Sequence, residues 1–348
     1  MPKPEKISKS LSLKFASLLR KAEKVNGTIT GIKKILVVRL NNIGDALVTT
    51  PLIGEFKKIG GVTIDILCSE RNKMVFEEQE FYRKIYIYDK KLKTFLKIIK
   101  EINSQNYDCI IDSHDDVSST ASLFIALSNC KYKAALEKSN TKLFTHTIQR
   151  PDATKTHPVE RVLEISKLFG INPDLNKANI LYKPSADSIV KATTFLHNNF
   201  KENKFVIGIN LFAGSDARFW GKENFISLIE YLKSFKTNIF FISPENKLDI
   251  AKSISNDVPV FSGSLDSVAA VISLSGLLIT PDTSLVHLAS ASETPVFGLF
   301  VHYNTNEVIW SPYKSKFDCV ITKEPTLENV KFDDVTQNLS VFLPSIRS

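Results

Sequence analysis

Short apolar segments alternate with helical patterns along most of this chain. Residues 35–39 lack the alternation of a half-exposed strand, which is typical of a strand buried on both faces of a sheet. Residues 92–102 place apolar side chains at the spacing of an amphipathic helix. The predicted strands of this first series cover residues 35–39, 62–68, 84–89 and 108–112. Strands separated by helices predict a parallel α/β sheet with right-handed crossovers.

The same pattern restarts after residue 203. Helices are predicted over residues 223–235 and 265–275, and strands over residues 204–212, 238–243, 258–263, 276–280 and 295–300. A stretch rich in Pro and Asn, residues 171–187, separates the two series and is the expected linker. We therefore predict two similar-sized parallel α/β domains that face one another across a cleft.

The positive charge of the chain is concentrated at one end. Residues 1–34 hold nine Lys and Arg against Glu5 and Glu23, so this segment carries +7 of the formal net charge of +8. The rest is nearly neutral, which does not favour nucleic-acid binding. Leucines and a phenylalanine between residues 11 and 19 are interleaved with basic residues, which suits an amphipathic helix on an anionic membrane. A solvated extension and a helix packed on the body are the alternatives.

Neither a membrane span nor secretion is indicated by the sequence. No apolar run approaches the roughly 20 residues of a membrane helix, and the N-terminus lacks the apolar region of a signal peptide. We therefore expect a cytoplasmic protein, at most peripheral at the inner face of the cytoplasmic membrane. The four cysteines, and the histidines at 146, 157, 287 and 302, show no metal-ligand spacing, so we expect no metal and no cofactor.

A strand, a tight turn and a helix are predicted over residues 276–289. The capping residues Asp282, Thr283 and Ser284 follow the strand, and a helical pattern begins at Leu285. Open α/β sheets bind ligands at the carboxyl ends of their strands, and the free N–H groups of a helix start suit phosphate. An ordinary crossover without a ligand is the alternative.

Two further polar loops follow predicted strands. After residues 35–39 comes a Gly-Asp turn, and Asp45 could act there as a general base or could cap the next helix. After residues 204–212 comes a loop in which Arg218 could bind a phosphate or a carboxylate. Trp220 is better explained as a core residue. The glycine-rich nucleotide-binding motifs of other α/β enzymes are absent from the sequence.

Four segments in order resemble glycosyltransferase family 9, the lipopolysaccharide heptosyltransferases. Residues 35–58 have the family's apolar strand, a basic residue, two polar residues, Gly-Asp and a later Thr-x-Pro. Residues 157–165 fit its His-x-Val-Glu-Arg pattern. Residues 217–232 resemble its basic-x-Trp segment, and residues 280–300 resemble its Asp-Thr segment with the following His and Leu-Phe.

The resemblance implies the GT-B fold, an α/β class with two Rossmann-like parallel-sheet domains facing across a cleft. Residues 33–180 would be the acceptor-binding domain, and residues 181–330 would be the donor-binding domain. Residues 1–32 would be a basic N-terminal extension, and residues 331–348 a C-terminal segment that packs back on the N-terminal domain.

The resemblance also implies roles for individual residues. Asp45 would be the general base, beside an acceptor-side loop of Asn41, Asn42 and Gly44. Arg218 would contact the donor phosphate. The other implied donor-binding residues are Ser215, Glu245 for the ribose, Asp282, Thr283, Ser284 and His287.

The implied function is an inverting, metal-independent transfer of a heptose-like sugar. The donor would be a nucleotide-sugar resembling ADP-heptose, and the acceptor a lipid-linked glycan of the lipopolysaccharide core or a related envelope glycan. Residues 1–30 would add contact with anionic membrane, and no nucleic acid is expected. The alternatives are a catalytically silent nucleotide-sugar-binding protein and a nucleotide-sugar epimerase or hydrolase of the same fold.

Overall fold

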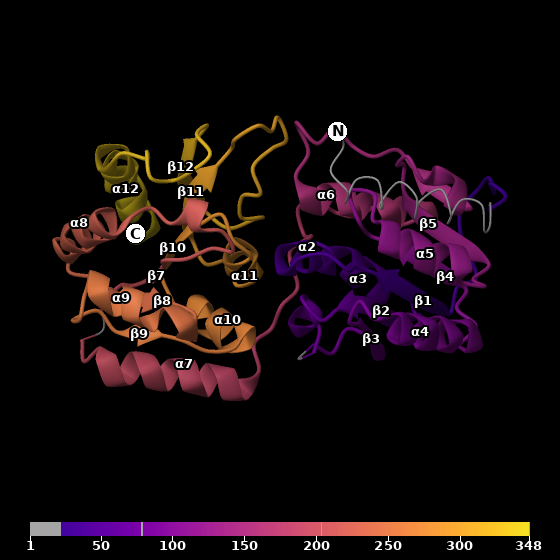
Figure 1. Cartoon of the computed structure of the whole chain (residues 1–348), viewed down its shortest axis with the longest axis horizontal. Coiled ribbons are helices and arrows are strands. Elements are labelled where there is room, and N and C mark those ends of the chain that lie inside the picture. Colours follow the sequence, from indigo (N-terminus) through magenta and orange to yellow (C-terminus); the bar gives the residue numbers. More distant parts are fainter. Residues whose placement is uncertain (1–21, 78, 203, 348) are drawn as a thin grey trace. The chain divides into compact units, whose positions relative to one another are not determined.

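The computed structural model describes residues 22–77, 79–202 and 204–347. The chain divides between Leu181 and Tyr182 into two compact units (Figure 1). Each unit is built on a six-stranded sheet whose neighbouring strands all run parallel. The predicted α/β fold with two Rossmann-like parallel sheets is confirmed.

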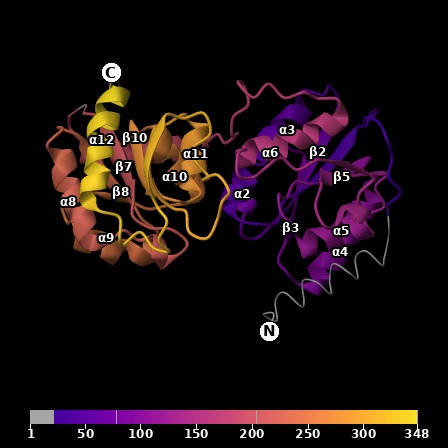
Figure 2. The ribbon, with the colours of Figure 1, turned by 90° about the horizontal axis from the view of Figure 1, so that it is seen from above.

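The sheet of the first unit has the strand order β3-β2-β1-β4-β5-β6. Its strands are β1 (Lys34–Val38), β2 (Thr63–Ser69), β3 (Lys84–Tyr88), β4 (Cys109–Asp112), β5 (Tyr132–Leu136) and β6 (His146–Ile148). Its helices are α2 (Ile43–Leu47), α3 (Thr50–Lys57), α4 (Leu92–Ser104), α5 (Ser119–Leu127) and α6 (Pro158–Leu163). Apolar side chains of α4 and α5 pack on one face of the sheet, and α3 and α6 lie on the other (Figure 2).

The sheet of the second unit has the order β12-β11-β10-β7-β8-β9. Its strands are β7 (Val206–Asn210), β8 (Asn238–Ile242), β9 (Val260–Phe261), β10 (Leu277–Pro281), β11 (Val296–Val301) and β12 (Phe317–Thr322). Its helices are α7 (Ala186–Asn199), α8 (Lys222–Lys233), α9 (Leu248–Ile254), α10 (Leu265–Ser273), α11 (Leu285–Ala291) and α12 (Phe332–Arg347). Trp220 is fully buried in the core under α8, as expected.

The C-terminal helix α12 belongs to the second unit. Val335, Leu339 and Leu343 form one apolar face, which is buried in the same core as α8 and β11. Arg347 at its end donates to the carbonyl oxygen of Phe235 at 3.0 Å. We expected residues 331–348 to pack back on the N-terminal domain, whereas the apolar face of α12 is used within the second unit.

Part of the expected N-terminal extension runs along the first unit. The N–H groups of Ala22 and Val25 donate to the carbonyl oxygens of Lys142 and Thr145, each at 3.0 Å, and Ile29 is buried. The predicted membrane-contacting segment falls mainly on residues 1–21, which lie outside the described residues. In the described ranges, no helix has the length and apolar character needed to cross a membrane.

Candidate active site

The turn after β1 presents a carboxylate at the carboxyl end of the first sheet. Helix α2 begins at Ile43, with Asn42 as its N-cap residue and Asp45 in its first turn. The Asn42 N–H donates to Asp45 Oδ2 at 3.2 Å, and Thr49 Oγ1 donates to the Asp45 carbonyl oxygen at 3.0 Å. Asp45 therefore stabilises the helix start. Its side chain is still 15% exposed, so the same carboxylate is accessible for chemistry.

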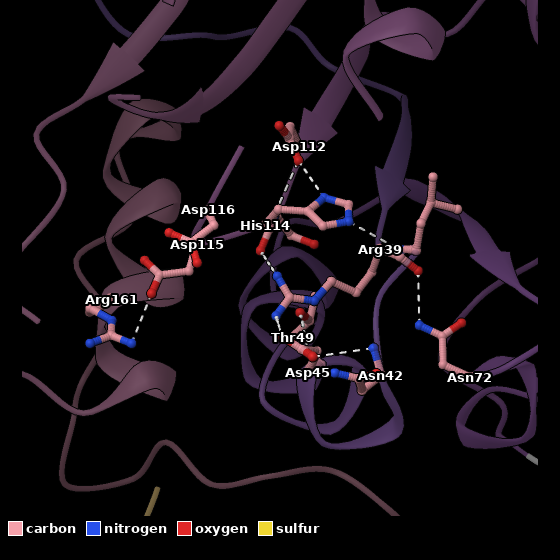
Figure 3. A network of polar contacts seen from close by, with 12 residues as sticks. Arg39, Asn42, Asp45, Thr49, Asn72, Asp112, His114, Asp115, Asp116 and Arg161 are labelled. Atoms are coloured by element: carbon pink, nitrogen blue, oxygen red, sulfur yellow. Dashed lines mark hydrogen bonds and ion pairs between the residues drawn. The ribbon is translucent and has the colours of Figure 1, made fainter. Parts of the chain in front are cut away.

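Asp45 is also paired with a buried arginine. Arg39, which directly follows β1, is 1% exposed and donates from Nη2 to Asp45 Oδ1 at 2.7 Å. Its Nη1 donates to the carbonyl oxygen of Ser113, directly after β4 (Figure 3). Each oxygen of the Asp45 carboxylate thus accepts one hydrogen bond from the protein. The sequence motif places Asp45 at this edge, but the pairing with Arg39 was not predicted.

A buried histidine anchors the same turn from β4. His114 Nδ1 lies 2.6 Å from Asp112 Oδ1, and the Leu40 N–H donates to His114 Nε2 at 3.0 Å (Figure 3). An acceptor at Nε2 requires the neutral ring with its proton on Nδ1. Burial raises the pKa of Asp112, but the Lys138 charge and the hydrogen bonds from His114 and Lys138 outweigh burial and hold that pKa well below its ordinary value.

Acidification is expected to destabilise the first unit through His114. Burial lowers the pKa of His114, against the opposing effect of Asp112, so the folded state favours the neutral ring. The contribution of the neutral His114 ring to the free energy of unfolding is fully present when the pH is above 6.5, the ordinary pKa of histidine. It is lost as the pH falls below that value. We expect His114→Gln to be less stable at neutral pH, with a shallower loss of unfolding free energy on acidification. Urea titrations over a pH series test this, with the exposed His197→Gln as control. An unchanged pH slope in His114→Gln would contradict it.

The ion pairs of Asp115, three residues after the end of β4, were also not predicted from the sequence. Asp115 accepts two hydrogen bonds from Arg150, at 2.7 and 3.0 Å, and one from the fully buried Arg161 at 2.8 Å. Burial raises the pKa of Asp115, but Arg150, Arg161 and Arg39 together hold it below its ordinary value. With three bonds to arginine, this carboxylate is structural in character.

A cavity of about 720 Å³ opens beside the turn after β1. Its walls are the loops that follow β1, β2 and β3 and the start of α5. Its lining residues include Asn41, Asn42, Glu70, Arg71, Asp89 and Lys90. Asn72 is fully buried and donates from Nδ2 to the Arg39 carbonyl oxygen at 3.0 Å, which ties the β2 loop to the β1 turn. The volume is within the roughly 300–1,000 Å³ of small-molecule sites.

The second unit brings Arg218 and Asp282 together. Arg218 ends a short 3₁₀ turn (Asp216–Arg218) after β7, and its Nη2 lies 2.9 Å from Asp282 Oδ2, directly after β10. Burial raises the pKa of Asp282, and the opposing charge of Arg218 does not fully offset this. Asn210 on β7 donates from Nδ2 to Thr280 Oγ1 on β10 at 2.9 Å, which joins the two strands close to where these loops begin.

The remaining donor-side residues lie around this pair. The Thr283 hydroxyl accepts from the Leu285 N–H at 3.1 Å, and Ser284 is the N-cap residue of α11. His287 is buried on α11, 5.8 Å from the Trp310 ring. Ser215 is exposed in the β7 loop, and Glu245 is exposed after β8.

The acceptor-side residues Asn41 and Asn42 are exposed and line the cavity of the first unit. Gly44 lies within α2 and is partly buried. Across the described residues, no group of three or more His, Cys, Asp or Glu side chains could hold a metal ion.

Comparison with known proteins places the chain in a family. The model of glycosyltransferase family 9 (heptosyltransferase) matches residues 95–340. Lipopolysaccharide heptosyltransferase 3 of Escherichia coli is 23% identical over 295 residues, which is 78% of this chain and 84% of the relative.

Solved structures show the same fold. A glycosyl transferase of family 9 from Veillonella parvula superposes with a TM-score of 0.79 at 18% identity, covering 92% of this chain and all of that one. The E. coli heptosyltransferase WaaC with ADP gives a TM-score of 0.71 at 19% identity, covering 90% and 99%. The same enzyme with ADP-2-deoxy-2-fluoro heptose gives 0.69, covering 88% and 99%.

Two Rossmann-like parallel sheets with polar residues after their strands are the architecture of a two-domain α/β protein that binds ligands at the strand ends. The family match covers most of the chain and includes the whole second unit up to α12. The chain belongs to glycosyltransferase family 9, the heptosyltransferase family.

Proposed function

We propose that this glycosyltransferase moves a heptose from ADP-heptose to a hydroxyl of a lipopolysaccharide-core or related envelope glycan, with inversion at the transferred carbon. Support for the donor comes from relatives solved with ADP and with an ADP-heptose analogue, and support for the glycan comes from the relative named above. The observation that carries the proposal is the accessible carboxylate of Asp45, held by two hydrogen bonds at the end of β1.

The reaction is a single displacement in which Asp45 is the general base. Asp45 takes the proton of the acceptor hydroxyl while that oxygen forms a bond to the anomeric carbon of the heptose. The bond from this carbon to the diphosphate breaks, and ADP leaves with the electron pair. General base catalysis of this kind typically contributes roughly 10²–10⁴-fold in rate.

The leaving diphosphate is stabilised by groups of the second unit. Arg218 supplies a planar cation able to form paired hydrogen bonds with phosphate. Within the described residues, the backbone N–H groups of Thr283 and Ser284 have no protein acceptor, so they remain available for the ligand. Together these groups would balance the diphosphate charge without a metal ion. Glu245 binds the ribose in this proposal, and Ser215 and His287 complete the donor site.

The acceptor binds in the cavity beside Asn41 and Asn42 and carries acidic groups. Four charged residues line this cavity, but its two acids are already paired: Glu70 lies 3.2 Å from Lys73, and Asp89 lies 3.1 Å from Lys91. In the described part of the chain, Arg71 and Lys90 have no acidic partner. These two cations are therefore the groups that would recognise phosphate or carboxylate on the glycan.

The loop that carries Lys90 is preorganised for this role. The Lys91 N–H donates to Asp89 Oδ1 at 3.0 Å, and this bond, with the Thr94 hydroxyl, holds the pKa of Asp89 at about 2. Lys90 itself has φ 67°, a left-handed conformation that is costly for a residue with a Cβ. Strain of this kind concentrates at ligand sites.

Arg71→Gln and Lys90→Gln are each expected to raise the KM for the acceptor by about tenfold, with kcat and donor KM little changed. Lys100→Gln, which removes an exposed cation outside the cavity, is the matched control. Initial rates are measured with ADP-heptose and deacylated lipopolysaccharide core. The KM is then measured for the same core after its phosphates are removed or its carboxyl groups are reduced. The treatment that raises the KM identifies the acidic group that is recognised. Equal KM values for both variants and the control would contradict the charge recognition.

The proposed function is tested by acceptor-dependent ADP release. The protein is incubated with ADP-heptose, with and without the deacylated core. Release only with the core supports transfer. Release without the core indicates a hydrolase, and ADP binding with no turnover on any core preparation indicates a catalytically silent binding protein.

A further inference from the structure

Arg39 is a buried cation that spans two elements beside Asp45. Its guanidinium donates from Nη2 to Asp45 Oδ1 at 2.7 Å and from Nη1 to the carbonyl oxygen of Ser113. The first contact is on helix α2, and the second is directly after β4. A planar group with two terminal nitrogens can make both contacts at once, whereas a lysine has one nitrogen.

Three hydrogen bonds hold the backbone around Arg39, and Figure 3 draws the ones that involve Asn72 and His114. The Arg39 N–H donates to the Leu67 carbonyl oxygen on β2 at 2.9 Å. The Asn72 Nδ2 atom donates to the Arg39 carbonyl oxygen at 3.0 Å. The next N–H, of Leu40, donates to His114 at 3.0 Å. Because the chain cannot shift easily here, the guanidinium has few alternative positions, and it restrains Asp45 in turn.

General stability does not explain a cation at this position. A buried charge is costly unless it is well paired, and an apolar side chain of similar volume would avoid that cost. The Arg39 Nε atom is buried with no hydrogen-bond partner in the described part of the chain, so the pairing is incomplete. Of the two side-chain hydrogen bonds that Arg39 makes, the one to an ionised group goes to Asp45.

We propose that Arg39 is a positioning residue, which holds the Asp45 carboxylate in the orientation from which it takes the acceptor proton. The proposal rests on the proposed function, because it assigns Arg39 a role that acts through Asp45. Errors of about 1 Å in a reacting group can cost on the order of 100-fold in rate.

The test compares kcat and KM of Arg39→Met with ADP-heptose and deacylated core as substrates. We expect kcat to fall roughly 10- to 100-fold, with both KM values and the Kd for ADP little changed. Arg39→Lys, which keeps the charge and loses the double contact, should recover part of kcat. A purely structural role would lower Tm without this split between kcat and KM.

Arg161→Met is the matched control. Arg161 is also fully buried in the first unit and is paired with a carboxylate, Asp115, at 2.8 Å. Its nitrogen Nη1 also donates to backbone carbonyl oxygens, of Ala153 and Thr156. We expect Arg161→Met to lower Tm while kcat stays near the wild-type value. An equal loss of kcat in both variants would overturn the proposal.

The double variant Arg39→Met/Asp45→Asn separates the positioning role of Arg39 from the base role of Asp45. If Arg39 acts through Asp45, the double variant is no slower than Asp45→Asn alone. It also removes both charges of the buried pair, so it remains informative if Arg39→Met alone does not fold. If the losses of kcat in the two single variants multiply in the double variant, Arg39 does not act through Asp45, and the positioning role is overturned. An Asp45→Asn variant of normal kcat would instead overturn the assignment of Asp45 as the general base in the proposed function.

Discussion

Asp45→Asn is expected to lower kcat for transfer by roughly 10²–10⁴-fold. The amide has nearly the same shape as the carboxylate, and its oxygen can still accept one of the two hydrogen bonds from Arg39 and the Asn42 N–H. It cannot take a proton from the acceptor hydroxyl. The Kd for ADP should stay unchanged, because the donor groups lie in the second unit.

The control for Asp45→Asn is Asp116→Asn. Asp116 is a nearby acid of the first unit, but its side chain is 86% exposed and lies 3.9 Å from Arg150. Steady-state rates, ADP calorimetry and Tm are measured for both variants. A near-normal kcat in Asp45→Asn would show that another group is the base. A lowered Tm without an isolated loss of kcat would leave Asp45 only its helix-capping role.

Arg218→Ala is expected to raise the Kd for ADP by on the order of 10- to 100-fold. The substitution removes the cation proposed for the diphosphate and also leaves Asp282, 2.9 Å away, without its counter-charge. The unpaired carboxylate would then repel the ligand phosphates. EDTA should change neither the wild-type nor the variant Kd, because the proposed site uses no metal ion.

The measurement for Arg218→Ala is calorimetric titration with ADP. Lys233→Ala, which breaks an exposed surface ion pair with Glu230 in the same unit, is the control. Arg218→Lys should bind with intermediate affinity, since it keeps the charge and loses the paired geometry. Equal Kd values for Arg218→Ala and the control, or wild-type binding that EDTA abolishes, would contradict the proposed donor site.

The central strands could be predicted because they are continuous apolar runs. β1 and β10 are buried on both faces, and such segments have one stable environment in an α/β protein. β5 was missed because Lys133 interrupts its apolar run, and the ammonium of this buried lysine donates to the carbonyl oxygen of Ile125 near the end of α5. β12 was missed because it is an edge strand with exposed positions.

The candidate site was predictable where a motif marks a strand end. Asp45, Arg218 and Asp282 each follow a strand in a segment that resembles the family. His114 and Arg39 were not assigned roles, because their contacts depend on β4 lying beside β1, which sequence order does not reveal. The available signal was the polar run after β4, at the same edge of the sheet as Asp45.

The most direct test of the account is the anomeric configuration of the transferred heptose. Wild-type protein is incubated with ADP-heptose and deacylated core in EDTA, and the new glycosidic bond is assigned by NMR. A single displacement with Asp45 as base predicts a product whose configuration is inverted relative to the donor. A product with retained configuration would contradict the account.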